Sequence, residues 1–135
     1  MKISIDFDGT LWEHQDFFRS FQKAMKAGGH TVGVLTAHSS TIQQRDYDLM
    51  VARGFIVPDF GIYAEYNEAE IAMRQAERDN EVIVGHYKAR SIISNNIDIH
   101  FDDNASYIRK WLNQWNADTP HHRVFTSPVD SHIPS

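Results

Sequence analysis

The sequence predicts an α/β protein, with a single doubly wound, Rossmann-like, mainly parallel sheet and helices on both faces. Short β-branched and aromatic runs alternate along the chain with segments whose apolar residues recur at helical spacing. Strands joined in this way by helices form right-handed crossovers, which cover both faces of a parallel sheet. The length of 135 residues fits one domain, residues 1–135, with a core of its own.

The first half of the chain contains three predicted strands and two predicted helices. Residues 3–7 form a short β-branched and aromatic run that stops at the turn sequence Asp8-Gly9-Thr10. Residues 16–27 carry apolar side chains at helical spacing, and the glycine pair that follows ends the pattern. The other elements are a buried strand at 31–36, a helix capped at Ser39 or Ser40 that runs to Arg53, and a third strand within 55–63, interrupted by Pro58.

The second half of the chain repeats the alternation. Residues 97–101 alternate between apolar and polar side chains, as a strand does, and the run stops at acidic residues. Residues 105–115 carry large apolar side chains at the spacing of one helix face. The other expected elements are a helix at 68–78, a short strand at 81–84, a helix at 88–95, an edge strand at 123–126 and a loosely held tail at about 127–135.

Composition excludes several classes of protein. With 13 Lys and Arg against 18 Asp and Glu, the net charge is −5, which argues against binding nucleic acid by charge alone. The chain has no cysteine, so disulfides, thiol nucleophiles and cysteine-bound metals are excluded, and its eight histidines lack zinc-site spacing. It has neither a signal-peptide pattern nor an apolar run long enough to span a bilayer. We therefore expect a soluble, cytoplasmic protein that does not bind membranes.

Chemically active side chains follow the predicted strands at their carboxyl ends, where ligands bind in open parallel sheets. Lys88 adds an ammonium group at the start of the helix that precedes the strand at 97–101. We expect these groups to converge at one edge of the sheet. The strand-end residues are Asp6 and Asp8 at the end of the first strand, Thr36 at the end of the second, and Asp102 and Asp103 after the strand at 97–101.

The carboxylates of this set predict a metal site. Asp6 and Asp8 are two residues apart, so an extended strand directs both side chains to the same face. With Asp102 or Asp103 added, the carboxylates would repel one another unless a hard divalent cation such as Mg²⁺ neutralised them. A calcium-binding loop is excluded, because the sixth and twelfth positions from Asp6 lack the required Gly and Glu.

The four segments resemble the four motifs of the haloacid dehalogenase (HAD) superfamily of phosphohydrolases, in that family's order along the chain. The resemblance covers residues 3–104 and implies a phosphatase of HAD type, a phosphoric monoester hydrolase. Asp6-Phe7-Asp8-Gly9-Thr10 resembles the first motif, Val34-Leu35-Thr36 the second, Lys88 the third and Phe101-Asp102-Asp103-Asn104 the fourth.

The resemblance also implies a role for each residue. Asp6 would be the nucleophile that forms an aspartyl-phosphate, and Asp8 would act first as acid and then as base. Mg²⁺ would be bound by the Asp6 side chain, the Asp8 carbonyl and Asp102, with Asp103 supporting these ligands. The choice between Asp102 and Asp103 as the direct ligand stays open. The phosphoryl group would be held by Thr36 and Lys88.

The spacing of the motifs limits the size of any cap over the site. Segment 64–87 has room for a small lid insert but not for a separate domain, so we expect an essentially capless protein that could alternatively close its site by forming an oligomer. We expect a phosphorylated small molecule or nucleotide as substrate. The ends of a nucleic acid are not favoured by the charge. Polynucleotide-end phosphatase activity, phosphotransfer and a catalytically idle phosphate-binding module stay open as alternatives, whereas the motif order disfavours a phospho-receiver module.

Overall fold

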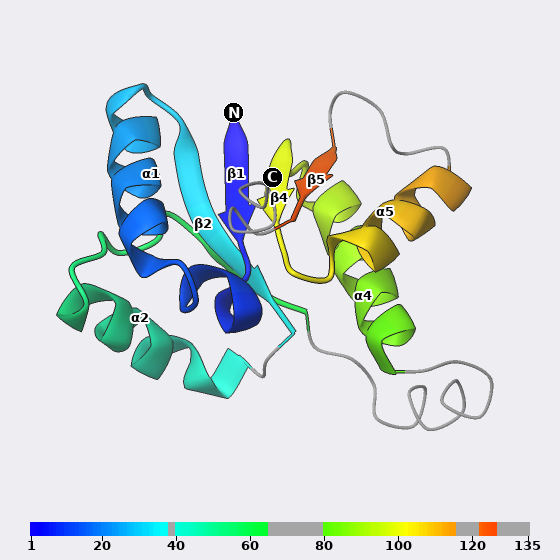
Figure 1. Cartoon of the computed structure of the whole chain (residues 1–135), viewed down its shortest axis with the longest axis horizontal. Coiled ribbons are helices and arrows are strands. Elements are labelled where there is room, and N and C mark those ends of the chain that lie inside the picture. Colours follow the sequence, from blue (N-terminus) through cyan, green and yellow to red (C-terminus); the bar gives the residue numbers. More distant parts are fainter. Residues whose placement is uncertain (38–39, 65–79, 116–121, 127–135) are drawn as a thin grey trace, which may run out of the picture.

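The computed structural model describes residues 1–37, 40–64, 80–115 and 122–126. Within these ranges five strands form one sheet, and every strand pairing in it is parallel. The strand order is β3-β2-β1-β4-β5 (Figure 1). The predicted fold class is confirmed. The strands are β1 (Lys2–Ile5), β2 (Thr31–Thr36), β3 (Gly61–Tyr63), β4 (Ile99–Phe101) and β5 (Arg123–Phe125).

Helices cover both faces of the sheet. Helices α1 (Gln15–Ala27) and α2 (Gln43–Ala52) lie on one face, and α4 (Asn80–Ser94) and α5 (Ala105–Gln114) lie on the other (Figure 1). A short 3₁₀ turn at Ser40–Ile42 precedes α2. This arrangement is the doubly wound one, and it follows from the right-handed connections between parallel strands.

The side chains of β1 and β2 alternate between the two faces and thereby divide the core. Ile3, Ile5 and Val34 are buried on the α1 and α2 side, together with Phe18 of α1 and Met50 of α2. On the opposite face Leu35 of β2 is buried in a second cluster with residues of α4, α5 and β5, among them Ile83, Ile92, Ile108, Leu112 and Val124. Each such side chain contributes about 1.5–3 kcal/mol when fully buried.

The expected strand at 81–84 is wrong, because α4 runs through it from Asn80 to Ser94. Its β-branched residues favour a strand locally. However, Ile83 and Tyr87 lie one helical turn apart and are both buried in the cluster that also contains α5. Packing between the helices therefore overrides local propensity. As a result, Lys88 lies in the middle of α4 instead of opening a helix at 88.

Other element boundaries differ by a few residues. β1 ends at Ile5, before the predicted end at 7, and β3 is confined to Gly61–Tyr63, after Pro58. The predicted helix at 68–78 and the tail at about 127–135 lie outside the described residues, as does most of the 64–87 segment considered for a lid. The remaining strands and helices agree with the sequence-based elements to within two or three residues at each end.

The strand order creates a crevice at one edge of the sheet. β1 pairs with β2 on one side and with β4 on the other. The chain leaves β1 through α1 and leaves β4 through α5, so the two connections lead to opposite faces (Figure 1). A divergence of this kind opens a ligand-binding crevice beyond the carboxyl ends of the two strands.

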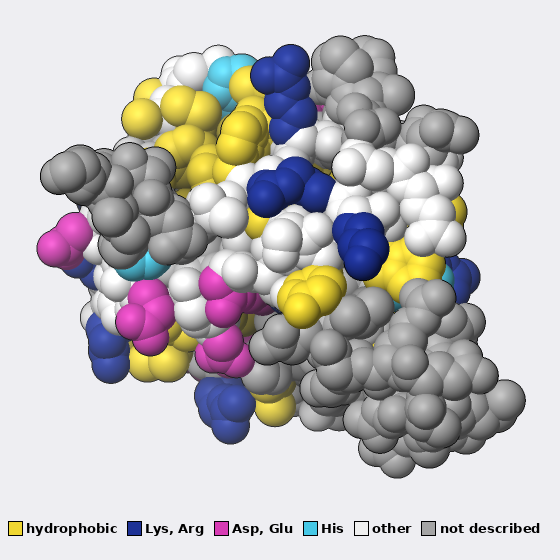
Figure 2. Space-filling model, turned by 45° about the vertical axis from the view of Figure 1, so that its right-hand side comes forward, with side chains coloured by type: hydrophobic (Ala, Val, Ile, Leu, Met, Phe, Trp, Pro, Cys, Tyr) yellow, Lys and Arg dark blue, Asp and Glu magenta, His cyan; other side chains and the backbone are white. Residues whose placement is uncertain are grey.

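The surface of the described residues is mixed in character. On the face shown in Figure 2, Lys and Arg side chains lie as separate groups among uncharged ones, and Asp and Glu side chains gather in the lower part of the view. None of the described helices is long and apolar enough to cross a membrane.

Candidate active site

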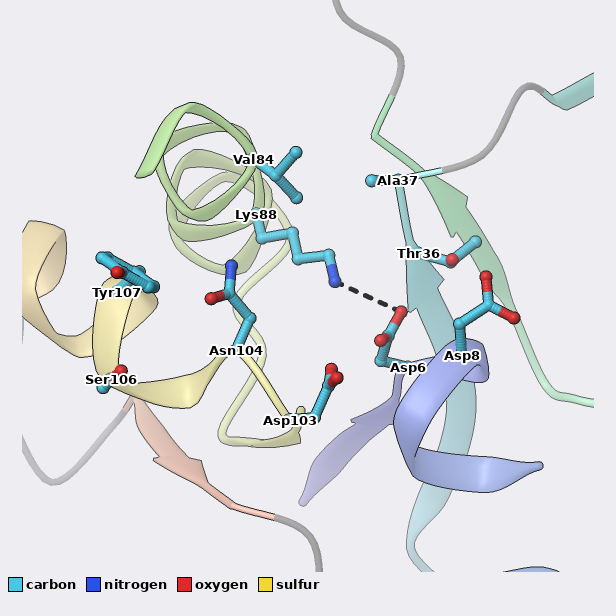
Figure 3. Close-up of a pocket in the computed structure, with 10 residues that line it drawn as sticks. All are labelled: Asp6, Asp8, Thr36, Ala37, Val84, Lys88, Asp103, Asn104, Ser106 and Tyr107. Atoms are coloured by element: carbon cyan, nitrogen blue, oxygen red, sulfur yellow. Dashed lines mark ion pairs between the residues drawn. The ribbon is translucent and has the colours of Figure 1, made fainter. Parts of the chain in front are cut away.

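A cavity of about 360 Å³ lies at the carboxyl ends of β1 and β2, facing the first turns of α5 and the middle of α4 (Figure 3). Its lining combines acidic, hydroxyl and ammonium groups with apolar surface from Val84 and Tyr107. The complete lining consists of Asp6, Asp8, Thr36, Ala37, Val84, Lys88, Asp103, Asn104, Ser106 and Tyr107.

A wide turn after β1 presents two carboxylates to this cavity. The turn is closed by hydrogen bonds from the Leu11 N–H to the Asp6 carbonyl (3.1 Å) and from the Trp12 N–H to the Phe7 carbonyl (3.2 Å). Asp6 is buried, whereas Asp8 is exposed. Both side chains reach the same cavity, although the strand itself ends before them, so the turn rather than the strand pleat brings them together.

The loop after β4 is fastened to the turn after β1. The backbone N–H of Asp103 donates to the hydroxyl of Thr10 (3.0 Å), which is completely buried. Asp103 is thereby placed at the cavity wall, where its carboxylate lies opposite Asp6 (Figure 3). The two acidic segments of the sequence thus meet at one edge of the sheet, as the spacing of the strands predicts.

Lys88 forms ion pairs with two carboxylates, those of Asp6 and Asp102. Its ammonium Nζ lies 2.7 Å from Oδ2 of Asp102 and 3.3 Å from Oδ1 of Asp6. All three side chains are 5% exposed or less, so water screens these ion pairs only weakly. Lys88 comes from the middle of α4 and reaches across the crevice toward Asp6 (Figure 3).

Behind Asp102 lies a buried polar pair that the sequence analysis missed. Nε2 of His100 is 2.8 Å from Oδ2 of Asp102, and Nδ1 of His100 is 2.7 Å from the hydroxyl of Ser4. Ser4, His100 and Asp102 are all completely buried. One signal in the sequence could have revealed the pair. Ser4 and His100 each lie two residues before an aspartate of the site, in the predicted strands 3–7 and 97–101, and strand alternation directs residues two apart to the same face.

Asp6 holds its proton unusually strongly. Burial raises its pKa to about 7, and the negative charge of Asp102 adds to this effect. The ammonium group of Lys88 acts in the opposite direction but does not offset the burial. The pKa of Asp103 is also raised, first by burial and then by its hydrogen bond to Asp102. In the protein alone, this site has more negative charge than one lysine can balance.

Asp102 behaves differently from its two neighbours. Burial would raise its pKa, but the hydrogen bond from His100 and the positive charge of Lys88 outweigh that effect and hold the pKa well below its ordinary value. For Lys88, burial would lower the pKa, yet the charges of Asp6 and Asp102 raise it above normal. Asp102 and Lys88 therefore form a fixed ion pair, and the pKa of His100 is lowered by burial.

The acidic cluster fits a divalent cation. Asp6, Asp102 and Asp103 each offer a carboxylate oxygen, and these oxygens all lie within 4.8 Å of one another. Hard oxygen donors of this kind suit Mg²⁺ or a similar ion. A bound cation would also offset the burial and the negative charge of Asp102, which together raise the pKa of Asp6. The structure thus contains a buried acidic site capable of holding a metal ion.

The residues predicted from the sequence occupy this region in two layers. Asp6, Asp8, Thr36, Lys88 and Asp103 line the cavity, whereas Asp102 is buried behind them. Trp12, which follows the first motif, could have lined the entrance, but it stacks on Phe7 with ring centroids 5.6 Å apart and is a packing residue. His38, two residues after Thr36, is a further candidate for flanking the site and lies outside the described residues.

Comparison of the chain with protein-family models, with curated proteins and with solved structures gives no match. The chemistry of the site must therefore be inferred from its own geometry. That geometry comprises a parallel α/β sheet and a buried acidic cluster at the ends of two adjacent strands.

Proposed function

We propose that the protein is a divalent-cation-dependent phosphohydrolase that acts on a phosphate monoester through an aspartyl-phosphate on Asp6. The observation that carries this proposal is the placement of Lys88 Nζ 3.3 Å from Oδ1 of Asp6, in a cavity that Asp8 and Thr36 also line. A carboxylate beside an ammonium group, a hydroxyl and a cation site is equipped to receive a phosphoryl group. The four segments that resemble the HAD motifs supply these groups.

In this proposal Asp6 attacks phosphorus and the bond to the leaving-group oxygen breaks. The phosphoryl oxygens gain negative charge during the transfer, and Lys88 stabilises that charge together with the hydroxyl of Thr36. Both groups are held in place before the substrate arrives: Lys88 is fixed by its ion pairs, and Thr36 is buried at the end of β2. This preorganisation favours the transition state because little rearrangement is needed.

Asp8 serves the two proton transfers. Its exposed side chain lies in the cavity (Figure 3), where a leaving group would depart and a water molecule would enter. Asp8 gives its proton to the leaving-group oxygen in the first step. It then takes a proton from the water that hydrolyses the aspartyl-phosphate, which releases inorganic phosphate and restores Asp6.

We propose Asp6 and Asp103 as the carboxylates that hold the cation, together with the carbonyl of Asp8. Asp103 lines the cavity. Asp102, in contrast, already accepts hydrogen bonds from Lys88, His100 and the N–H of Asn104, the last at 2.8 Å. When bound, the cation supplies positive charge that keeps Asp6 ionised and neutralises phosphoryl oxygens. This arrangement favours Asp103 over Asp102 as the direct ligand.

A small substrate suits the site best. The wall opposite Asp8 combines the ring of Tyr107 with Val84, which fits a flat or apolar leaving group such as a nucleobase or an aryl ring. On the face shown in Figure 2 the basic side chains do not form a continuous surface of the kind that a polynucleotide needs. A nucleotide or small phosphate ester therefore remains the proposed substrate class.

The test is phosphate release from 4-nitrophenyl phosphate with Mg²⁺, comparing the native protein with Asp6→Asn. Asp48→Asn is a matched control, because Asp48 is an exposed residue of α2. We expect Mg²⁺-dependent release by the native protein and the control, and loss of at least about 1,000-fold in Asp6→Asn.

Two outcomes would overturn the proposal. Release that survives Asp6→Asn would exclude Asp6 as the nucleophile. A folded protein that binds Mg²⁺ and phosphate esters but releases no phosphate from aryl esters, nucleotides or sugar phosphates would indicate a phosphate-binding module instead. Transfer of the phosphoryl group to an added alcohol in preference to water, at an alcohol concentration far below that of water, would identify a phosphotransferase that uses the same residues.

A further inference from the structure

We propose that His100 and Ser4 are positioning residues that act through Asp102 to fix Lys88 beside Asp6. The effect of this positioning on catalysis rests on the proposed phosphohydrolase function. The position of Lys88 itself can be measured without any activity. The residues form one continuous chain of contacts from β1 and β4 to α4. Its members are Ser4, His100, Asp102, Lys88 and Asp6.

The sheet fixes the first two members of this chain. Ser4 and His100 are paired residues in the parallel ladder between β1 and β4. Their side chains are on the same face and meet at 2.7 Å. Both are completely buried, so neither can exchange its partner for water. The imidazole ring therefore has a fixed orientation relative to the sheet.

The fixed ring in turn orients the carboxylate. Asp102 accepts at Oδ2, so Nε2 of His100 carries the proton, and Nδ1 is left to accept from the hydroxyl of Ser4. The backbone N–H of Asn104 holds the other oxygen, Oδ1, at 2.8 Å. His100 and Asn104 thus hold the Asp102 carboxylate from two sides independently of Lys88. Its Oδ2 atom faces α4, where Lys88 lies.

Lys88 needs such an anchor because its ammonium group ends a flexible four-carbon stem. Oδ2 of Asp102 lies 2.7 Å from Nζ, while Oδ1 of Asp6 lies farther away, at 3.3 Å. The closer contact sets the position of the ammonium group. If His100 no longer donated to Oδ2, the buried carboxylate would lack one partner and would turn, and Lys88 would move with it.

Two substitutions separate this role from simple core packing. In His100→Gln the amide nitrogen takes the place of Nε2 and can still donate to Asp102. In His100→Asn the amide nitrogen takes the place of Nδ1 and reaches only Ser4. We expect kcat for 4-nitrophenyl phosphate to fall about tenfold or more in His100→Asn, and His100→Gln to recover most of it. The Mg²⁺ concentration for half-maximal rate should stay unchanged in both variants, because the effect runs through Lys88.

A second measurement reports on Lys88 directly. In ¹⁵N-labelled native protein the buried ammonium group should give a slowly exchanging N–H signal, assigned by its loss in Lys88→Met. We expect His100→Gln to keep this signal and His100→Asn to lose it, while circular dichroism and the melting temperature show that both variants are folded.

The outcomes are distinct. Equal kinetic and spectroscopic effects of Gln and Asn would make His100 a core residue only and would overturn the inference, as would an ammonium signal unchanged in both variants. If the native protein releases no phosphate, the proposed function fails. The ammonium signal then still decides whether His100 positions Lys88.

Discussion

Gly9 and Asp103 are in direct contact across the site: a Cβ atom built on Gly9 would lie 2.3 Å from Oδ2 of Asp103. Gly9 also adopts a φ of +72°, in the region that favours glycine. The turn after β1 therefore needs glycine for two separate reasons. The backbone must turn there, and the carboxylate of Asp103 occupies the space where any other side chain would begin.

Substituting Gly9 with alanine should therefore damage the site more than the fold. The positive φ costs an alanine on the order of 1–3 kcal/mol of unfolding free energy. The new methyl group also displaces Asp103, and a shift of about 1 Å at a catalytic group can lower the rate about 100-fold. We expect a loss of that size in kcat/KM and a weaker Mg²⁺ affinity, measured by phosphate release over a Mg²⁺ titration.

Gly29→Ala is the matched control. Gly29 has a φ of +87°, but a Cβ there would meet nothing within 4 Å. The Gly29→Ala substitution should lower the unfolding free energy about as much as Gly9→Ala while leaving kcat/KM and Mg²⁺ affinity unchanged. Equal kinetic loss in both variants would show that strain, and not contact with Asp103, explains the effect.

The sequence predicts much of this site because the site is formed at the ends of strands. Segments at the carboxyl ends of parallel strands must meet at one edge, so the alternation of strands and helices is enough to bring Asp6, Asp8, Thr36 and Asp103 together. The spacing of apolar residues likewise predicts the sheet, because it reports which face each residue buries.

What the sequence does not predict depends on contacts between distant elements. Asp102 and Asp103 are adjacent in the chain, and only the orientation of the loop after β4 decides which one faces the cavity. The start of α4 depends on packing against α5, which a local run of β-branched residues does not reveal. The contact of His100 with Ser4 joins residues 96 positions apart.

Replacing Asp102 and Asp103 by asparagine, one at a time, should separate the contribution of each carboxylate to cation binding and to the position of Lys88. In Asp103→Asn we expect the Mg²⁺ concentration for half-maximal rate to rise at least about tenfold, because the proposed cation ligand, which lines the cavity, loses its charge. In Asp102→Asn the Lys88 ammonium loses its closest partner, so kcat should fall while the Mg²⁺ requirement changes less. A rate assay over a Mg²⁺ titration measures both effects, and the reverse pattern would identify Asp102 as the direct ligand.

The metal-free protein should become less stable as Asp6 ionises. The pKa of Asp6 is about 7 in the folded protein and close to 3.8 in the unfolded chain. Between pH 4 and 7 the folded state therefore binds more protons than the unfolded state. The unfolding free energy contributed by this group therefore falls with rising pH across that window. Each pKa unit is worth about 1.4 kcal/mol, so the fall is on the order of a few kcal/mol.

Other groups titrate nearby, so the comparison is made with Asp6→Asn. The pKa of buried His100 is lowered, so this residue acts in the opposite direction below about pH 6.5, where unfolding lets it take up a proton. Urea unfolding of both proteins with a chelator, at pH 5 and 7.5, should show that the native protein loses stability relative to the variant. A constant difference between the two proteins would contradict the raised pKa of Asp6.

Tyr107 should determine which leaving groups the site prefers. Tyr107 lines the cavity. Helix α4 passes so close to it that a Cβ on Gly85 would lie 2.9 Å from the Cβ of Tyr107, so this contact fixes the position of the Tyr107 backbone. Contact between the ring and a flat leaving group is worth about 0.5–1.5 kcal/mol. Tyr107→Leu should therefore lower kcat/KM for 4-nitrophenyl phosphate about two- to tenfold relative to that for glycerol phosphate. Tyr107→Phe keeps the ring and should keep the preference. If Tyr107→Leu lowers kcat/KM equally for both substrates, the ring supports the fold of the site and does not contact the leaving group.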